Sequence, residues 1–241
     1  MKTNIRLTLY SLLAAVSVAG CQAAESEVGF TSIFNGKDLT GWEGNPALWS
    51  VKDGAITGTT KAEAPIKANT FLIWTNGSPG DFELRLKYKI VGNNPGNQAN
   101  SGIQYRSKVI DQSQWIAGGY QADIEAGNNY TGILYEERMT RGIMALRGEK
   151  VLWTGDSKKQ LTGKLSTAEE VQAVIKPGDW NEYRVAAKGN VLQHFINGKQ
   201  SVEVVDETKE KAATSGIIGL QLHVGPPMTV QFKDIRLREL K

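Results

Sequence analysis

Short runs of alternating apolar and polar residues recur along most of the chain. The clearest covers residues 82–90, in which Phe, Leu, Leu, Tyr and Ile alternate with Glu, Arg, Lys and Lys. A period of two is typical of a half-buried β-strand, because successive side chains point to opposite faces. Similar runs cover residues 101–107, 120–125, 132–136, 181–187, 191–196, 216–224 and 229–237. This pattern predicts an all-β protein.

Residues typical of turns separate these runs, and Asn197-Gly198 has the composition of a tight hairpin turn. Only residues 166–174 have helical character, with Ser166 as the expected N-cap and Glu169 three residues later. Many short strands with one short helix favour a jelly-roll sandwich of two antiparallel sheets. The chain has 241 residues and neither an internal repeat nor a low-complexity linker, so residues 29–241 are expected to form one domain.

The first twenty residues have the pattern of a signal peptide. Lys2 and Arg6 precede a largely apolar segment at 7–18, which is shorter than the roughly 20 residues needed to span a bilayer. Ala and Gly then precede Cys21, the only cysteine, and Val-Ala-Gly-Cys resembles the bacterial lipobox. We therefore expect residues 1–20 to be removed and Cys21 to be lipidated.

Residues 21–28 would then be a lipidated tether to the bacterial cell envelope. Gln22 follows the cysteine where an aspartate would favour inner-membrane retention, so we expect the outer membrane, facing the periplasm or the cell surface. The formal net charge is +3, and no run of five basic residues occurs. Neither nucleic acid nor a polybasic membrane patch is therefore predicted. The oligomeric state is left open.

Several strands place amides and charged groups on the face that alternates with the apolar one. If Tyr105, Tyr120, Tyr135 and Leu222 belong to the core, alternation predicts an outward set of Gln104, Arg106, Gln121, Asp123, Glu125, Glu136, Gln221 and His223. Any antiparallel sheet can have a polar face in water. This set, however, contains no lysine, and its planar amides and carboxylates suit sugar hydroxyls, which both donate and accept hydrogen bonds.

Candidate proton-transfer groups are Asp123, Glu125, Glu136, Glu137 and His223. His194 shares a strand face with Leu192 and Ile196, so it could belong either to the core or to the site. One cysteine and two histidines exclude a zinc site of the usual Cys/His type. We expect no cofactor, although a calcium ion near Asp123 stays open. Exposed tryptophans among Trp74, Trp115 and Trp153 could stack on sugar rings.

Seven segments, taken in order, resemble those of a known family. They are 34–42 (FNGKDLTGW), 100–106 (NSGIQYR), 118–123 (GGYQAD), 132–137 (GILYEE) with Arg141-Gly142, 179–182 (DWNE), His194 before Asn197-Gly198, and 219–228 (GLQLHVGPPM). Together they resemble the 3-keto-disaccharide hydrolase domain family over about residues 29–240.

The resemblance implies a concanavalin A-like (laminin-G-like) jelly roll acting on glycosides whose sugar carries a ketone at C3. It implies catalytic roles for Asp123, Glu136, Glu137, His223 and Arg106. With the strand pattern, it gives substrate-binding candidates Gln104, Gln121, Gln221, Tyr105, Glu125, His194 and Trp153. Which group is the acid and which the base is left open.

Two other functions fit the same residues. The first is a lectin-like carbohydrate-binding module that uses the concave face without catalysis. The second is a retaining jelly-roll endoglycosidase, which has carboxylates at alternate positions of one strand. Asp123 and Glu125 are such a pair, but Asn129 stands where a further glutamate is expected.

Replacing the predicted lipidation residue tests the lipoprotein hypothesis. Cys21→Ser should leave the folded domain intact but release it from the membrane, because the lipid is attached through the thiol. Fractionation of cells that express the variant should show it in the soluble fraction. A variant that stays with the membranes would contradict lipid anchoring through Cys21.

Overall fold

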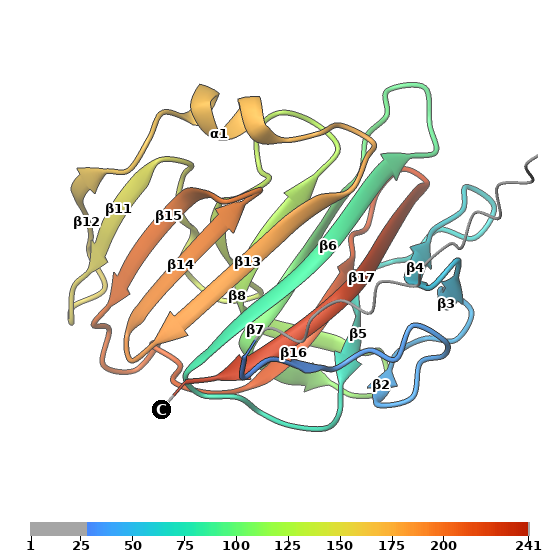
Figure 1. Ribbon diagram of the computed structural model, residues 1–241, viewed down its shortest axis with the longest axis horizontal. Coiled ribbons are helices and arrows are strands. Elements are labelled where there is room, and N and C mark those ends of the chain that lie inside the picture. The colour runs from blue at the N-terminus through green and yellow to red at the C-terminus, as the bar shows by residue number, and fades with distance from the viewer. Residues whose placement is uncertain (1–27, 241) are drawn as a thin grey trace, which may run out of the picture.

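The computed structural model describes residues 28–240, which form two stacked β-sheets and one short helix (Figure 1). The predicted signal peptide, Cys21 and all but the last residue of the predicted tether lie outside the described residues. The prediction of an all-β jelly-roll-like sandwich with one short helix is confirmed. Among residues 28–240, no helix is long and apolar enough to cross a membrane.

The ten-stranded sheet has the strand order β12-β11-β15-β14-β13-β6-β17-β4-β3, and β1 also pairs with β17. The bounds are β12 (Lys159–Lys164), β11 (Glu149–Trp153), β15 (Lys199–Asp206), β14 (Val191–Ile196), β13 (Asn181–Lys188), β6 (Phe82–Gly92), β17 (Met228–Glu239), β4 (Ala55–Thr59), β3 (Trp49–Lys52) and β1 (Thr31–Ser32). Its pairs are antiparallel except β11 with β15, which is parallel and was not predicted.

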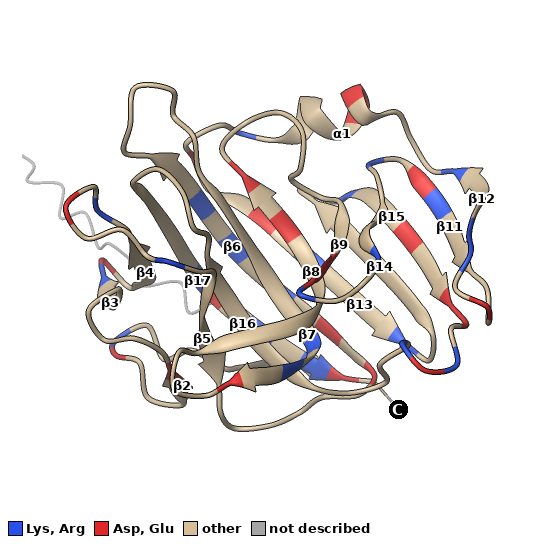
Figure 2. Ribbon diagram, turned by 180° about the vertical axis from the view of Figure 1, so that it is seen from behind, with Lys and Arg blue, Asp and Glu red and all other residues tan. Residues whose placement is uncertain are grey.

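The seven-stranded sheet has the order β10-β9-β8-β7-β16-β5-β2 and faces the viewer in Figure 2. Its strands are β10 (Gly142–Ala145), β9 (Leu134–Glu137), β8 (Ile116–Glu125), β7 (Asn100–Asp111), β16 (Ile217–Leu222), β5 (Thr70–Trp74) and β2 (Trp42–Glu43). The apolar faces of the two sheets meet in one core, to which β6 contributes the alternating side chains of Phe82, Leu84, Leu86, Tyr88 and Ile90.

The helix α1 (Ala168–Val174) begins later than predicted. Its N-cap is Thr167 and its capping box is completed by Glu170, so the prediction of Ser166 and Glu169 was wrong. Ser166 precedes this N-cap by one residue, and its hydroxyl donates to the carbonyl of Gln200, 3.4 Å away.

His194 lies fully buried between the sheets, so its placement in the site was wrong. Its Nε2 lies 2.9 Å from the hydroxyl of Tyr105, which is also fully buried and not a surface contact as predicted. Nδ1 lies 3.2 Å from the carbonyl of Ile133, so Nδ1 donates and Nε2 accepts. Burial lowers the pKa of His194 to about 3, which keeps the ring neutral.

Arg106 points away from the predicted site because β7 is irregular at this residue. Its φ is 44°, and the register between β7 and β8 shifts between Tyr105 and Lys108. A bulge of this kind turns a side chain off the alternating pattern. The buried guanidinium donates to the carbonyls of Gly80 and Gly189 and pairs with Asp81 at 2.8 Å. Arg106 therefore fastens surrounding loops to the sheet.

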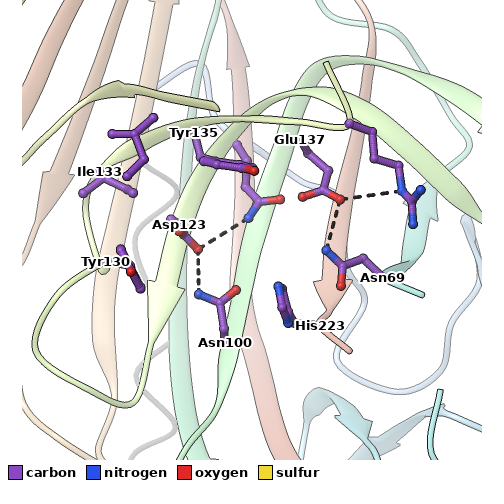
Figure 3. A pocket seen from close by; sticks show the side chains of 11 residues that line it. Asn69, Asn100, Asp123, Tyr130, Ile133, Tyr135, Glu137 and His223 are labelled. Carbon is purple, nitrogen blue, oxygen red and sulfur yellow. Dashed lines mark hydrogen bonds and ion pairs between the residues drawn. The ribbon is translucent and has the colours of Figure 1, made fainter. Parts of the chain in front are cut away.

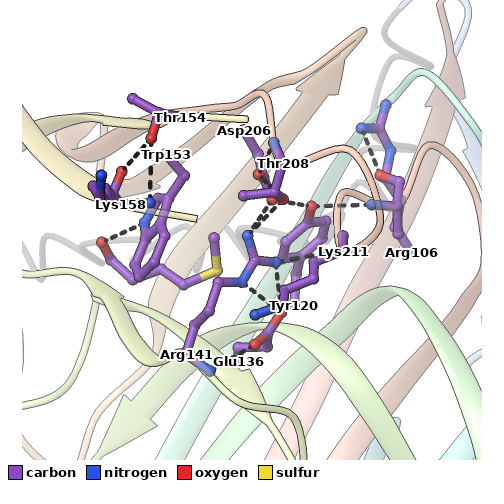
Figure 4. A network of polar contacts seen from close by, with 12 residues as sticks. Arg106, Tyr120, Glu136, Arg141, Trp153, Thr154, Lys158, Asp206, Thr208 and Lys211 are labelled. Atoms are coloured by element: carbon purple, nitrogen blue, oxygen red, sulfur yellow. Dashed lines mark hydrogen bonds and ion pairs between the residues drawn. The ribbon is translucent and has the colours of Figure 1, made fainter. Parts of the chain in front are cut away.

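Glu136 also lies on the core side, where it joins a buried ion network between the two sheets (Figure 4). Arg141 donates to Glu136 at 2.5 Å and to Asp206 at 2.7 Å. Burial raises the pKa of Asp206, but hydrogen bonds from Thr208, Tyr120 and Arg141 outweigh it and lower the pKa overall. The predicted catalytic placement of Glu136 was therefore wrong.

Trp153 was predicted to contact substrate, and this placement was wrong as well. Its ring lies against Arg141, with 5.3 Å from the guanidinium carbon to the ring centroid, and its Nε1 donates to the carbonyl of Met144. Trp74 is also buried, and Trp115 packs partly buried against Phe71, Ile73 and Ala117. None of the three is an exposed stacking surface.

The two histidines should differ in their effect on stability. His194→Ala leaves a cavity and unpartnered tyrosine hydroxyls, so it should lower the free energy of unfolding by about 2–5 kcal/mol at pH 7. The deficit should shrink as pH falls from 6.5 toward 3. In that range His194 binds a proton in the unfolded wild-type chain but not in the folded one. The free energy of unfolding of the wild type therefore falls by up to about 1.4 kcal/mol per pH unit.

Urea unfolding at pH 7 and pH 4.5 measures this difference. His223→Ala is the matched control, because its side chain is partly exposed at the surface, and it should change stability little. Equal effects of the two substitutions would contradict the placement of His194 in the core.

Candidate functional site

A pocket of about 430 Å³ lies on the outer face of the seven-stranded sheet (Figure 3). Its lining combines strand and loop residues: Asn69, Asn100, Gln121, Asp123, Tyr130, Ile133, Tyr135, Glu137, Arg138, Ile143 and His223. The predicted residues Gln121, Asp123, Glu137 and His223 are therefore brought together on one side of one sheet. Their roles stay predictions.

A network of amides forms the floor of the pocket. The Nε2 groups of Gln104 and Gln221 donate to Oε1 of Gln121 at 3.2 and 3.0 Å. Gly102 makes room for this packing, because a Cβ at that position would lie 2.5 Å from the Gln121 side chain. Gln104 and Gln221 were predicted to contact substrate, but both are fully buried and neither lines the pocket, so they hold the pocket residues in place.

Asp123 lies at the centre of the pocket wall with only 5% of its surface exposed. Its Oδ1 accepts three hydrogen bonds, from Asn100 Nδ2 at 3.2 Å, Gln121 Nε2 at 3.4 Å and the backbone amide of Ile124 at 3.0 Å. Burial raises the pKa of Asp123 to about 8, and these hydrogen bonds offset it only in part. At neutral pH the carboxyl group is therefore mostly protonated, and Oδ2 is the oxygen left to act on a ligand.

Glu137 is held by neutral and cationic donors. Asn69 Nδ2 donates to Oε1 at 3.0 Å, and Gln221 Nε2 donates to Oε2 at 3.4 Å. The Nε of Arg138 lies 3.7 Å from Oε1. Arg138 has a φ of 51° and lines the pocket. This carboxylate can accept hydrogen bonds from sugar hydroxyls.

His223 follows β16 directly and lines the same pocket. Its Nδ1 lies 2.6 Å from the carbonyl of Val224, so Nδ1 donates and Nε2 is the ring nitrogen that stays available to a ligand. The amide of Val224 donates to Oδ1 of Asn69, whose Nδ2 holds Glu137. Asn69 therefore fixes His223 and Glu137 relative to each other.

Glu125 lies beside the pocket and does not line it. Its Oε2 accepts the backbone amides of Asn129 and Tyr130 at 2.9 and 3.0 Å, which closes the loop at residues 126–131. The predicted substrate contact of Glu125 and its pairing with Asp123, expected for a retaining endoglycosidase, stay predictions. Glu125 positions Tyr130, which the sequence pattern did not identify.

The structure also adds residues to the site that the sequence pattern missed. Asn69, Asn100 and Arg138 lie at strand ends or in turns, where alternation carries no information. Tyr135 was assigned to the core, but it pairs with Gln121 and shares its outer face. The acidic Glu137 two residues later was the available signal, because a carboxylate on the same face argues against burial in an apolar core.

No three His, Cys, Asp or Glu side chains within residues 28–240 come together as a metal site. The expectation that the protein needs no cofactor stays a prediction. Asp123 is surrounded by amides that donate to it, and a calcium site would instead need several convergent oxygen ligands.

Comparison with known proteins places these observations in a family. The family model described as "3-keto-alpha-glucoside-1,2-lyase-like domain" matches residues 29–238. A curated relative, the 3-keto-disaccharide hydrolase of Bacteroides thetaiotaomicron, is 23% identical over 207 residues. That match covers 82% of this chain but 66% of the relative, so the chain spans about two thirds of the relative's length.

Solved structures with the same fold are more distant in sequence. A candidate glycosyl hydrolase from Parabacteroides distasonis is 21% identical with a TM-score of 0.55, covering 88% of this chain and 99% of that one. A carbohydrate-binding module from Bacillus subtilis is 13% identical with a TM-score of 0.52, covering 84% of this chain and 98% of that one. At these identities the likeness shows the fold alone.

The raised pKa of Asp123 makes a testable contribution to stability. The folded protein keeps a proton on Asp123 up to about pH 8, whereas the unfolded chain releases it near 3.8. Stability is therefore lost as pH rises through this range, by up to about 1.4 kcal/mol per pH unit. Asp123→Asn, which mimics the protonated form, should become progressively more stable than the wild type from pH 4 to pH 8.

Urea unfolding at several pH values measures the difference. Glu203→Gln is the control, because that carboxylate lies on β15 of the other sheet and pairs with Lys150 at 2.7 Å. The control should show no such gain. A stability difference for Asp123→Asn that does not grow with pH would rule out a protonated Asp123.

Proposed function

Because the chain belongs to the 3-keto-alpha-glucoside-1,2-lyase-like domain family, we propose that it cleaves the glycosidic bond of sugars oxidised to a ketone at C3. One observation carries this proposal beyond family membership. The pocket combines a carboxyl group that keeps its proton at neutral pH with a histidine whose Nδ1 is engaged by a carbonyl, which leaves Nε2 to take up a proton from substrate. A paired acid and base are what an elimination next to a ketone requires.

The proposed reaction begins at C2, whose proton is acidified by the neighbouring C3 ketone. Nε2 of His223 takes this proton, and the electron pair forms an enolate with its negative charge on the C3 oxygen. The enolate then re-forms the ketone as a C1=C2 double bond forms and the C1–O bond breaks. The leaving oxygen takes the proton of Asp123, which gives an alcohol and an unsaturated 3-keto sugar.

The same two residues can complete hydrolysis, because the elimination leaves each in the opposite protonation state. The Asp123 carboxylate removes a proton from water as its oxygen adds to C1. The protonated His223 returns a proton to C2. The net products are the 3-keto sugar and the free alcohol, and both side chains regain their starting states.

Two other pocket residues are suited to stabilise the enolate. Burial, with smaller contributions from nearby carboxylates, raises the pKa of Tyr135, so its hydroxyl keeps a proton to donate. The guanidinium of Arg138 supplies a positive charge at the same rim. Donors that are already in place where negative charge develops lower the barrier. We assign Glu137 to binding a sugar hydroxyl and to holding Arg138 in position.

The direct test is release of the alcohol from a 3-keto-disaccharide, followed by chromatography, with the unoxidised disaccharide as the control substrate. The proposal expects turnover of the keto sugar only, since the unoxidised sugar has no acidic C2 proton. A protein that binds the keto sugar without cleaving it is a lectin-like module, and that result would overturn the proposal.

Substitutions at the acid and the base should lower kcat far more than they change KM. Asp123→Asn and His223→Ala should each lower kcat by about 10²-fold or more, the usual value of general acid–base catalysis. Activity of the wild type should fall as pH rises through about 8, because Asp123 then loses the proton it must donate. Glu203→Gln should leave both constants unchanged. A His223→Ala enzyme with normal kcat and raised KM would show that His223 only binds substrate.

A further inference from the structure

A second cleft of about 850 Å³ opens beside the catalytic pocket. It lies between the loop at residues 126–131, the turn before β11, strand β12 and the start of α1. Tyr130 lines both the pocket and the cleft, so the two cavities adjoin at this residue. We call this region the Tyr130 cleft and define it by Tyr130, Leu146, Arg147, Leu161 and Thr167.

Exposed apolar side chains gather at this cleft. Among the described residues, eight large apolar side chains are exposed, and Tyr130, Leu146 and Leu161 of this set line the cleft with 43%, 45% and 56% exposure. A fourth, Ile143, lines the adjoining pocket. Single exposed apolar residues are ordinary, but several around one concave surface mark a ligand site.

Several polar side chains of the cleft are already engaged. The Glu149 carboxylate accepts from Lys159 Nζ at 2.9 Å and from the amide of Leu146 at 2.8 Å. Thr167 is occupied in the capping box of α1. Arg147 donates to Gln172 at 2.6 Å and to the carbonyl of Asn128. These groups have fewer hydrogen bonds left for a ligand, so the contacts that remain are the exposed side chains of Tyr130, Leu146 and Leu161 and a polar rim of Asn129, Lys164 and Glu169.

The loop that carries Tyr130 is held in place from both sides. Glu125 accepts a hydrogen bond from the backbone amide of Tyr130. On the other side, Nε2 of Gln172 in α1 donates to Oδ1 of Asn128 at 3.1 Å. Arg147, which is 8% exposed, fixes the same asparagine through its carbonyl. A wall ordered before the ligand arrives does not lose conformational entropy on binding.

The order of groups across the pocket relates this cleft to the reaction. In Figure 3, Asp123 lies between Tyr130 on one side and Glu137 and His223 on the other. Under the proposed mechanism, His223 faces C2 and Asp123 faces the leaving oxygen on C1. The leaving group, which continues from that oxygen, is then directed toward Tyr130.

We propose that the Tyr130 cleft binds the leaving group, and that it favours an apolar aromatic group over a second sugar. This inference rests on the proposed function, because it takes the position of the leaving group from the roles of Asp123 and His223. A sugar could stack on Tyr130, but it would place hydroxyls against Leu146 and Leu161, which offer no hydrogen bonds. An aromatic ring has no hydroxyl groups that would lose hydrogen bonds to water on entering this part of the cleft.

The test compares 2-phenylethyl and methyl 3-keto-glucosides, which share the sugar and release simple alcohols. The wild type should have a kcat/KM at least tenfold higher for the phenylethyl substrate, because only that substrate reaches the cleft. A Leu146→Ser/Leu161→Ser double variant should bring this ratio to within about threefold of one. It should affect a 3-keto-disaccharide much less than the phenylethyl substrate.

Ile110→Ser is the matched control, since Ile110 is 49% exposed but lies on β7 outside both cavities. The ratio of kcat/KM for the phenylethyl substrate to that for the methyl substrate should be the same in this variant as in the wild type. A wild-type ratio near one, or a ratio unchanged in the double variant, would overturn the inference, and the wild-type measurement holds even if the double variant does not fold. Absence of cleavage of every 3-keto-glucoside by the wild type would instead overturn the proposed function.

Discussion

The need to satisfy buried polar groups is the constraint on which the candidate site depends. Two sets of carboxyl groups in this fold meet it in opposite ways. Glu136 and Asp206 are buried against the guanidinium of Arg141, whose positive charge offsets the cost of burying ionised carboxylates between the sheets. Asp123 is buried among amides with no cation in contact, so burial raises its pKa and the neutral acid is the stable form. The same sandwich therefore holds one ionised cluster of Glu136, Arg141 and Asp206 between the sheets and one protonated acid in the candidate pocket.

The pocket depends equally on groups that never touch it. Gln104 and Gln221 hold Gln121, and Asn69 ties Glu137 to the turn that carries His223. Arg106 fastens the loops near Gly80 and Gly189 to β7, while His194 links the two sheets through Tyr105 and the carbonyl of Ile133. Arg106 and His194 thus have side-chain types common in active sites, but here they stabilise the fold.

Strand alternation predicted the fold and part of the site for a physical reason. Where a strand is regular, as in β8, its period of two correctly separates buried Tyr120 and Ala122 from Gln121 and Asp123. The pattern failed where the backbone leaves that period, as at the Arg106 bulge, and where an apolar ring faces the pocket, as at Tyr135. Tyr130 and Arg138 lie in turns, whose position depends on long-range contacts that no local pattern encodes.

Deuterium incorporation tests the central claim, elimination by an acid and a base on one sheet face, most directly. A 3-keto-glycoside is incubated with the protein in heavy water, and the released 3-keto sugar is analysed by mass spectrometry and NMR against a sample without protein. Removal and return of the C2 proton predict one deuterium at C2 of the product, beyond the exchange seen without protein. Cleavage that releases the sugar with its original C2 hydrogen, and that is not slowed when C2 of the substrate carries deuterium, would contradict this mechanism and indicate direct displacement at C1.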